Sequence, residues 1–149
     1  MNDIVQALLG SPSVERITDY QRAVLALPQI DPPIEHLFAD GLYARPMYMK
    51  AGETVVGATH GKEHLCVVQG HCIVVDGTSR RELDGWNVFV SKPGAKRAII
   101  ALEDTVWMTV HATELTDVSA IEKAVLIPEK EPNRFFPDGT QETIERKDP

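Results

Sequence analysis

The hydrophobic pattern of the chain changes character near residue 41. From Leu42 onward, short apolar runs rich in β-branched residues are separated by single glycines, at Gly52, Gly61, Gly70, Gly77, Gly85 and Gly94. Turns at this spacing are typical of a sandwich or barrel of short antiparallel strands. The pattern therefore predicts a mainly β fold for the middle of the chain.

The two ends of the chain carry helical patterns instead. A short helix is predicted over residues 3–9, and Ser11-Pro12 supplies the cap and first position of a second helix that reaches Pro28. A third helix is predicted over residues 116–126, with Thr116 as its cap. We expect one folded unit with three parts: a helical prefix and proline-rich connector (1–40), a β-barrel (41–115), and a C-terminal helix with an extended tail (116–149).

The strand predicted over residues 105–113 has two different faces. Strict alternation places Trp107, Thr109, His111 and Thr113 on one face and Val106, Met108, Val110 and Ala112 on the other. The second face is interpreted as core. The first combines an aromatic ring, hydroxyls and an imidazole, which favours a ligand-lined barrel interior.

Two histidines flank the residues Gly61-Lys62-Glu63 within an otherwise strand-like run. Residues four apart along one straight strand lie roughly 13 Å from each other, too far to share a ligand. If residues 61–63 form the tip of a hairpin, His60 and His64 face each other across it. A solvent-exposed hairpin tip is the alternative interpretation.

Two segments resemble the conserved motifs of the cupin superfamily. The first runs through the strand that ends in VVQG at 67–70, the short strand 72–75 and the turn Asp76-Gly77; the second is the strand 83–90 followed by Lys92-Pro93-Gly94. The resemblance covers roughly residues 41 to 113 and implies a single jelly-roll barrel of antiparallel strands.

A narrower resemblance involves residues 41–45 and the stretch 98–113 preceded by Lys96-Arg97. These segments are similar to small cupin-like proteins of tailed bacteriophages and prophages. That similarity implies a fold and an origin, and it implies no reaction.

The positions that bind metal in many cupins are changed in this chain. Counting back from Gly70 places Gly57 and Thr59 at the two usual histidine positions, Glu63 at the glutamate and Arg97 at the last histidine. On that register the usual site is missing its histidines. Moving the register by one residue places His60 and His64 at the second histidine and the glutamate, and neither register restores the histidine after the Pro-Gly turn.

A different metal site remains open. If the strand that carries His111 faces the same cavity as His60 and His64, three imidazoles converge, with Glu63 as a further candidate ligand. Such a set suits zinc, iron or manganese with open positions.

The basic pair after the Pro-Gly turn favours an anionic ligand. An inward-pointing Arg97 would bind a carboxylate or phosphate and would repel a nearby cation. Tyr43 and Arg45 share a strand face and could add an aromatic wall and a further anion contact. The expected ligand-binding residues are thus His60, His64, Lys96, Arg97, Trp107, His111, Tyr43 and Arg45.

Composition narrows the classes of protein. At 149 residues the chain can bury roughly two thirds of its unfolded surface, so one domain is expected. The net charge of -7 argues against general nucleic-acid binding. No run has the length of a membrane span and no secretory leader is evident, so we expect a cytoplasmic protein without a membrane partner. Cys66 and Cys72 are expected to be reduced and buried.

Three functions compete at this stage. The first is a pocket that binds a small anion, such as a nucleotide-like compound or sugar phosphate, and sequesters it. The second is a metal-dependent cupin enzyme that uses His60, His64 and His111. The third is a structural or virion-associated homo-oligomer, a dimer or larger, whose helical prefix and tail serve assembly. The sequence shows no nucleophile paired with a base, no phosphate-binding loop and no cysteine cluster. These observations favour a protein that is not an enzyme.

Overall fold

A computed structural model describes residues 17, 19, 21–23, 29–77 and 79–127 of the chain. This part is mainly β, which confirms the predicted fold class. The elements in chain order are β1 (Leu37–Ala39), β2 (Leu42–Met49), β3 (Thr54–Val56), β4 (His64–Val75), β5 (Arg80–Ser91), β6 (Ala98–Ala101), β7 (Thr105–Ala112) and α3 (Val118–Val125).

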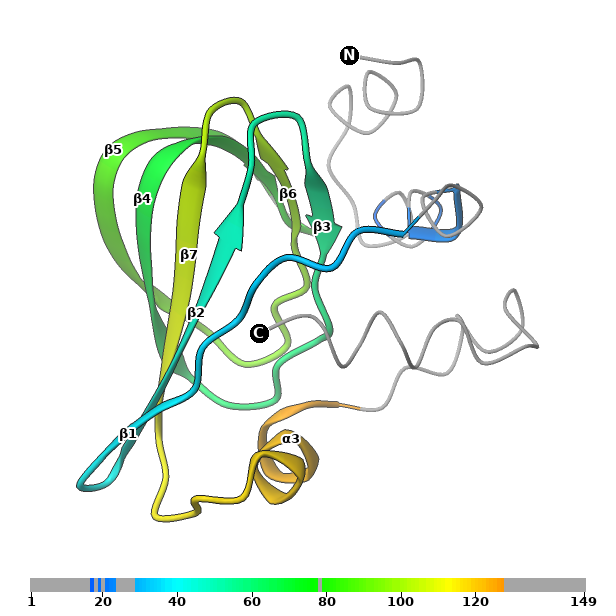
Figure 1. Ribbon diagram of the computed structural model, residues 1–149. Coiled ribbons are helices and arrows are strands. Elements are labelled where there is room, and N and C mark those ends of the chain that lie inside the picture. Colours follow the sequence, from blue (N-terminus) through cyan, green and yellow to red (C-terminus); the bar gives the residue numbers. More distant parts are fainter. Residues whose placement is uncertain (1–16, 18, 20, 24–28, 78, 128–149) are drawn as a thin grey trace.

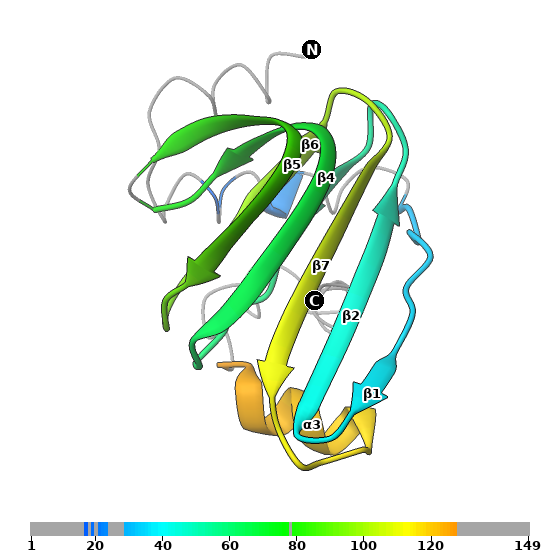
Figure 2. The same cartoon turned by 90° about the vertical axis from the view of Figure 1, so that its left-hand side faces the viewer.

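All the strand pairs are antiparallel, and together they form one curled sheet (Figure 1). The order along it is β1-β2-β7-β4-β6-β3, and β5 follows β4 along its whole length. The first half of β4 pairs with β7 and its second half pairs with β6. β4 and β5 therefore bend from one wall of a half-barrel to the other (Figure 2).

The bend in β4 requires a glycine. Gly70 has φ 143°, and a Cβ at this position would lie 2.5 Å from Thr105 Oγ1 and 2.6 Å from the carbonyl oxygen of Asp104. A side chain would thus collide with the backbone that leads into β7. Gly85, opposite Gly70 on β5, also has a positive φ, of 78°.

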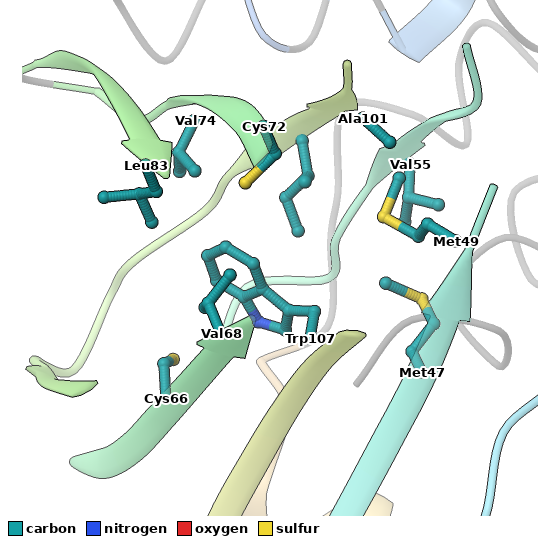
Figure 3. Close-up of a cluster of buried hydrophobic side chains, with 11 residues drawn as sticks. Met47, Met49, Val55, Cys66, Val68, Cys72, Val74, Leu83, Ala101 and Trp107 are labelled. Carbon is teal, nitrogen blue, oxygen red and sulfur yellow. The ribbon is translucent and has the colours of Figure 1, made fainter. Parts of the chain in front are cut away.

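The inner face of the sheet changes from polar to apolar along three adjacent strands. In one row across the sheet, Arg45 on β2 pairs with Thr109 on β7, which pairs with Cys66 on β4. In the next row, Met47 pairs with Trp107, which pairs with Val68. The apolar rows form the main core together with Cys66 from the neighbouring row (Figure 3). Its members are Met47, Met49, Val55, Cys66, Val68, Cys72, Val74, Leu83, Ile99, Ala101 and Trp107.

The prefix and α3 cover different parts of the half-barrel. Ile17, in a helical segment of the prefix, is fully buried in a cluster with Val56 and Ile100, on the outer face of the β3–β6 wall. One open end is covered by α3, which packs through Ile121 and Val125 (Figure 1). This α3 end is the polar end of the inner face. None of the described helices is long and apolar enough to span a membrane.

The structure corrects two local predictions, the helix cap and the hairpin. α3 is capped by Asp117, whose carboxylate accepts a hydrogen bond from Ala120 N, so Thr116 is not the cap. The segment 57–63 is not a hairpin tip, because β3 pairs with β6 whereas β4 pairs with β5, β6 and β7. His60 instead forms an isolated bridge with Leu126, just after α3.

The assignment of the two faces of β7 is also corrected. Its buried face carries Trp107, Thr109 and His111, while Val106, Met108 and Val110 are only half-buried and Ala112 is exposed. The face interpreted as core is thus the outer face, and both the apolar core and the polar end lie on the other side. The predicted helix over 3–9 and the tail after residue 127 lie outside the described residues.

Candidate functional site: a buried histidine cluster

Three of the five histidines meet at the polar end of the half-barrel. His60, His64 and His111, here called the histidine cluster, are 5%, 5% and 3% exposed. Their ring centroids lie 4.5 Å (His60–His64), 4.3 Å (His64–His111) and 5.3 Å (His60–His111) apart. One nitrogen of each ring lies within 4.8 Å of the corresponding nitrogens of the other two. The predicted convergence of the three imidazoles is confirmed.

Sheet register brings two of these histidines together. Leu65 pairs with Val110, so one step further along the same register His64 lies opposite His111. Both side chains point inward because each lies an even number of residues from Cys66 or Thr109 on its own strand.

His60 reaches the histidine cluster from the connection between β3 and β4. Its N–H donates to Ala95 O (3.3 Å) and its carbonyl accepts from Gly94 N (2.8 Å). The same connection is tied to the end of α3, since Gly61 N donates to Val125 O (2.6 Å) and Ile127 N donates to Thr59 O (2.8 Å). The backbone on both sides therefore fixes the position of His60.

One histidine of the cluster makes the kind of hydrogen bond that a metal-ligating imidazole usually makes. His64 Nδ1 lies 3.0 Å from the carbonyl oxygen of Lys62, so it must carry the proton and Nε2 keeps its lone pair. A ligating histidine usually donates its other N–H to such a carbonyl. His111 Nε2 is buried without a hydrogen-bond partner among the described residues. An unsatisfied buried nitrogen is costly unless something binds it.

Burial also keeps His64 and His111 neutral. Desolvation lowers the pKa of His111 to about 4, and the nearby charges of His64, Lys62 and Arg45 act in the same direction. Desolvation likewise lowers the pKa of His64; its bond to the Lys62 carbonyl opposes the shift, and Arg97 adds to it. A neutral imidazole at pH 7 is the form that binds metal.

Two small cavities adjoin the histidine cluster. The larger, of about 20 Å³, is lined by His60 and His64 together with Cys66, Arg97, Trp107 and Thr109, among others. The smaller, of about 10 Å³, lies on the α3 side and is lined by Tyr43, Arg45, His60 and His111, among others. A volume of this size holds about one water molecule or metal ion. A whole nucleotide or sugar phosphate does not fit in either cavity.

Two arginines give the site its positive charge. Arg45 is 4% exposed, and Arg97 has a buried Nε without a hydrogen-bond partner among the described residues. The Arg97 guanidinium carbon also lies 5.5 Å from the centre of the Phe89 ring. Guanidinium groups this close to the imidazoles oppose a bare cation and attract an anion.

Two predicted site residues do not join the histidine cluster. Glu63 is exposed, and its carboxylate pairs with Lys92 Nζ at 2.7 Å, so the structure removes it from the candidate metal ligands. Lys96 is buried, but its ammonium donates to the Gly57 carbonyl (3.3 Å) and does not line either cavity. The remaining predicted residues line one cavity or both.

Two further residues line the site: Thr109, which strand alternation had placed on the face expected to line a ligand cavity, and Cys66, which was expected only to be buried. Both line the larger cavity, and Thr109 Oγ1 is buried without a hydrogen-bond partner among the described residues. Their spacing could have identified them from the sequence, because each lies two residues from a cluster histidine on the same strand. Cys66 and Cys72 are both free thiols, and burial raises the pKa of each to about 11.

Comparison with known proteins finds solved structures of similar fold and no match at the level of sequence. Neither a family model nor a curated protein matches the sequence. Solved structures with a related fold include a cupin superfamily protein from Desulfitobacterium hafniense, at 11% identity over 58% of this chain and 83% of that chain, with a TM-score of 0.45.

Two further cupin structures are comparably similar. A cupin-2 domain protein from Shewanella frigidimarina is 10% identical over 62% of this chain and 92% of its own, with a TM-score of 0.46. A cupin 2 conserved barrel domain protein from Salinispora arenicola is 15% identical over 66% of this chain and 87% of its own, also with a TM-score of 0.46. At this level of identity the resemblance concerns the fold and says nothing about a ligand or a reaction.

Proposed function

We propose that this protein binds one divalent transition-metal ion through His60, His64 and His111. The observation that carries the proposal is the buried histidine cluster itself, with three ring nitrogens within 4.8 Å of one another. Three protein ligands with open positions are typical of metal sites that also bind a substrate or water. Imidazole ligands suit zinc, iron, copper or nickel better than magnesium or calcium.

The chain's own residues prepare this site in three ways. The Lys62 carbonyl fixes the His64 tautomer that leaves Nε2 available. Burial keeps the His64 and His111 imidazoles unprotonated at neutral pH. The bridge between His60 and Leu126 and the packing of α3 restrict solvent access from one end. A bound metal would supply Lewis-acid chemistry, or redox chemistry if it is iron or copper.

A small anion is the second component of the proposal. Arg45 and Arg97 line the two cavities beside the histidine cluster and so place positive charge near the proposed cation. An anion bound next to the metal would neutralise both charges. The cavities limit what enters to a group about the size of a carboxylate or a phosphate oxygen. A nucleotide-like compound or sugar phosphate could present only its anionic end.

The second candidate function is a small-anion site without a metal. It is supported by the buried Arg97 Nε, which has no hydrogen-bond partner among the described residues and is a ready donor. Under this alternative the protein sequesters an anionic metabolite and has no metal chemistry. The bacteriophage origin, a cytoplasmic location and a role in virion assembly remain proposals that rest on the sequence alone.

Metal content tests the first candidate. Untagged protein purified without chelator, and again after reconstitution with zinc or ferrous iron, is analysed by mass spectrometry of the elements. We expect about one ion per chain in wild type, none in His111→Ala, and the wild-type amount in His36→Ala, which removes a histidine that belongs to no candidate metal group among the described residues. Metal-free wild type after reconstitution would reject the proposal.

Anion binding separates the two candidates. Thermal unfolding is followed with phosphate or acetate, with and without metal, in wild type and Arg97→Gln. If the metal site is correct, the anion stabilises the loaded protein more than the metal-free one, and His111→Ala abolishes the difference. If the anion stabilises the metal-free protein through Arg97 alone, the second candidate is correct.

A further inference from the structure

Strand β5 forms one edge of the sheet and leaves that edge open. Among the described strands β5 pairs only with β4, and in Figure 2 no labelled strand lies along its other side. A strand with an open edge presents unpaired backbone N–H and carbonyl groups that can pair with another strand.

The outer face of this edge is unusually apolar. Trp86 is 66% exposed, Val88 53% and Val90 50%. The adjacent position on β4 continues the patch, because Leu65, also exposed, lies directly beside Val90. We call Leu65, Trp86, Val88 and Val90 the edge patch. Contiguous exposed apolar residues of this kind mark interaction sites.

The usual protection of a free edge strand is missing from the second half of β5, whereas its first half carries Arg80, Arg81, Glu82 and Asp84. Proteins commonly place lysine, proline or an inward-pointing charge on such an edge. The segment 85–91 reads Gly-Trp-Asn-Val-Phe-Val-Ser and contains none of these. An unprotected edge of this length is expected to be covered in the working protein.

Charge at the two ends of the segment identifies the occupant as an identical strand. Asp84 precedes the segment and Lys92 follows it, and both are exposed. If a second copy of β5 runs antiparallel about a two-fold axis at Val88, Trp86 lies opposite Val90 of the second copy. One step further, Asp84 lies opposite Lys92 of the second copy, at both ends of the pair. Opposite charges directly across an antiparallel pair stabilise it.

We propose that the protein forms a two-fold dimer in which the β5 strands of two copies pair antiparallel, centred at Val88. Residues of even number from 84 to 92 then share one face, so both edge patches join into one apolar stripe with an ion pair at each end. Lys92, which pairs with Glu63 within one chain, is on the surface and free to exchange that partner for Asp84 of the second copy. The proposal does not depend on the histidine cluster.

Cysteine cross-linking of the full-length chain tests the register. Directly opposite residues in an antiparallel pair have Cα atoms about 4.5–5.5 Å apart, within the range of a disulfide. Val88→Cys should therefore form a disulfide-linked dimer on mild oxidation. The two copies of residue 90 would lie roughly 13 Å apart, so Val90→Cys should not. Native Cys66 and Cys72 are fully buried and provide the wild-type background.

Light scattering of wild type, Val88→Lys and Leu37→Lys completes the test. Leu37 is 49% exposed on β1 and serves as the matched control. We expect wild type to be a dimer. The dimer dissociation constant should rise more than about tenfold in Val88→Lys and should not change in Leu37→Lys. A monomeric wild type, which includes the case that residues 128–149 cover the strand, overturns the proposal. So does a dimer insensitive to Val88→Lys, or one in which Val90→Cys cross-links as readily as Val88→Cys.

Discussion

The two halves of the half-barrel interior are equally buried and chemically opposite. At the apolar end, Met47 and Trp107 pack with Val68 in a continuous hydrophobic core. At the polar end, the same three strands place Arg45, Thr109 and His64 inward with exposures as low as those of the core residues. The two ends therefore have the same degree of burial. They differ in how much that burial contributes to the free energy of folding.

The difference shows where the fold is stabilised and where it has another purpose. Removing apolar side chains from water contributes about 25 cal/mol per Å². Burying imidazoles, guanidiniums and a hydroxyl without full hydrogen bonding opposes folding. Three adjacent strands bury polar side chains at the polar end in spite of this unfavourable free energy. We assign this burial to ligand binding.

The largest effect should come from a change at the apolar end. Met47→Ala removes a fully buried side chain and should lower the free energy of unfolding by about 2–5 kcal/mol. Leu42→Ala, at an exposed position on the same strand, should change it by less than about 0.5 kcal/mol. Urea denaturation measures both. Equal effects of the two substitutions would show that the apolar end is not the stabilising core.

Acid should destabilise the metal-free protein through the polar end. The pKa of His111 is about 4 when folded and 6.5 when unfolded, so the unfolded chain binds more protons between these values. Stability should therefore fall as the pH drops from 6.5 to 4, by up to about 3 kcal/mol from this residue. Urea denaturation in chelator at several pH values measures it. In His111→Leu the slope should be shallower, and an unchanged slope would contradict the assignment.

Weakening α3 should loosen the polar end only. Asp117→Ala removes the cap that accepts from Ala120 N and should destabilise the helix by about 1 kcal/mol. Hydrogen exchange should then speed up at the amides of 118–127, while the amides of β4 next to the apolar core keep their protection. The prediction fails if protection is lost uniformly, because the two ends would then unfold together.

The smallest effect on stability is expected from His111→Leu at pH 7 without metal. Replacing a neutral, incompletely bonded imidazole by a similar-sized apolar side chain should change the free energy of unfolding by less than about 1 kcal/mol, in either direction. Zinc should raise the melting temperature of wild type and leave the variant unchanged. A large loss of stability in the variant would make His111 a structural residue.

Strand pattern and composition were enough to predict the mainly β class, and alternation along β7 placed Trp107, Thr109 and His111 on one face. The same pattern did not tell which face was inside, because valine and methionine on the outer face are as apolar as a core. The hairpin expected around residues 61–63 was wrong, because the pairing of β4 with β7 and the bridge from His60 to Leu126 are contacts distant in sequence.

The site was predictable in part. The convergence of the three histidines followed once His111 was assigned to the inner face, whereas Glu63 looked like a ligand only because of its place in the sequence motif. Its exposure and its pairing with Lys92 depend on how the 57–63 connection is folded, which local pattern does not determine. The edge patch on β5 was missed since a half-exposed strand and a buried one have similar apolar content.

Calorimetric titration of the metal-free, untagged protein with zinc at pH 7 tests the central claim most directly. We predict one zinc ion per chain in wild type and in His36→Ala. Loss of an outer contact already weakens a metal site by about 10–100-fold, so loss of a ligand in His64→Ala should weaken binding at least about 100-fold. Equal affinity in wild type and His64→Ala, or no binding to wild type, would contradict the account.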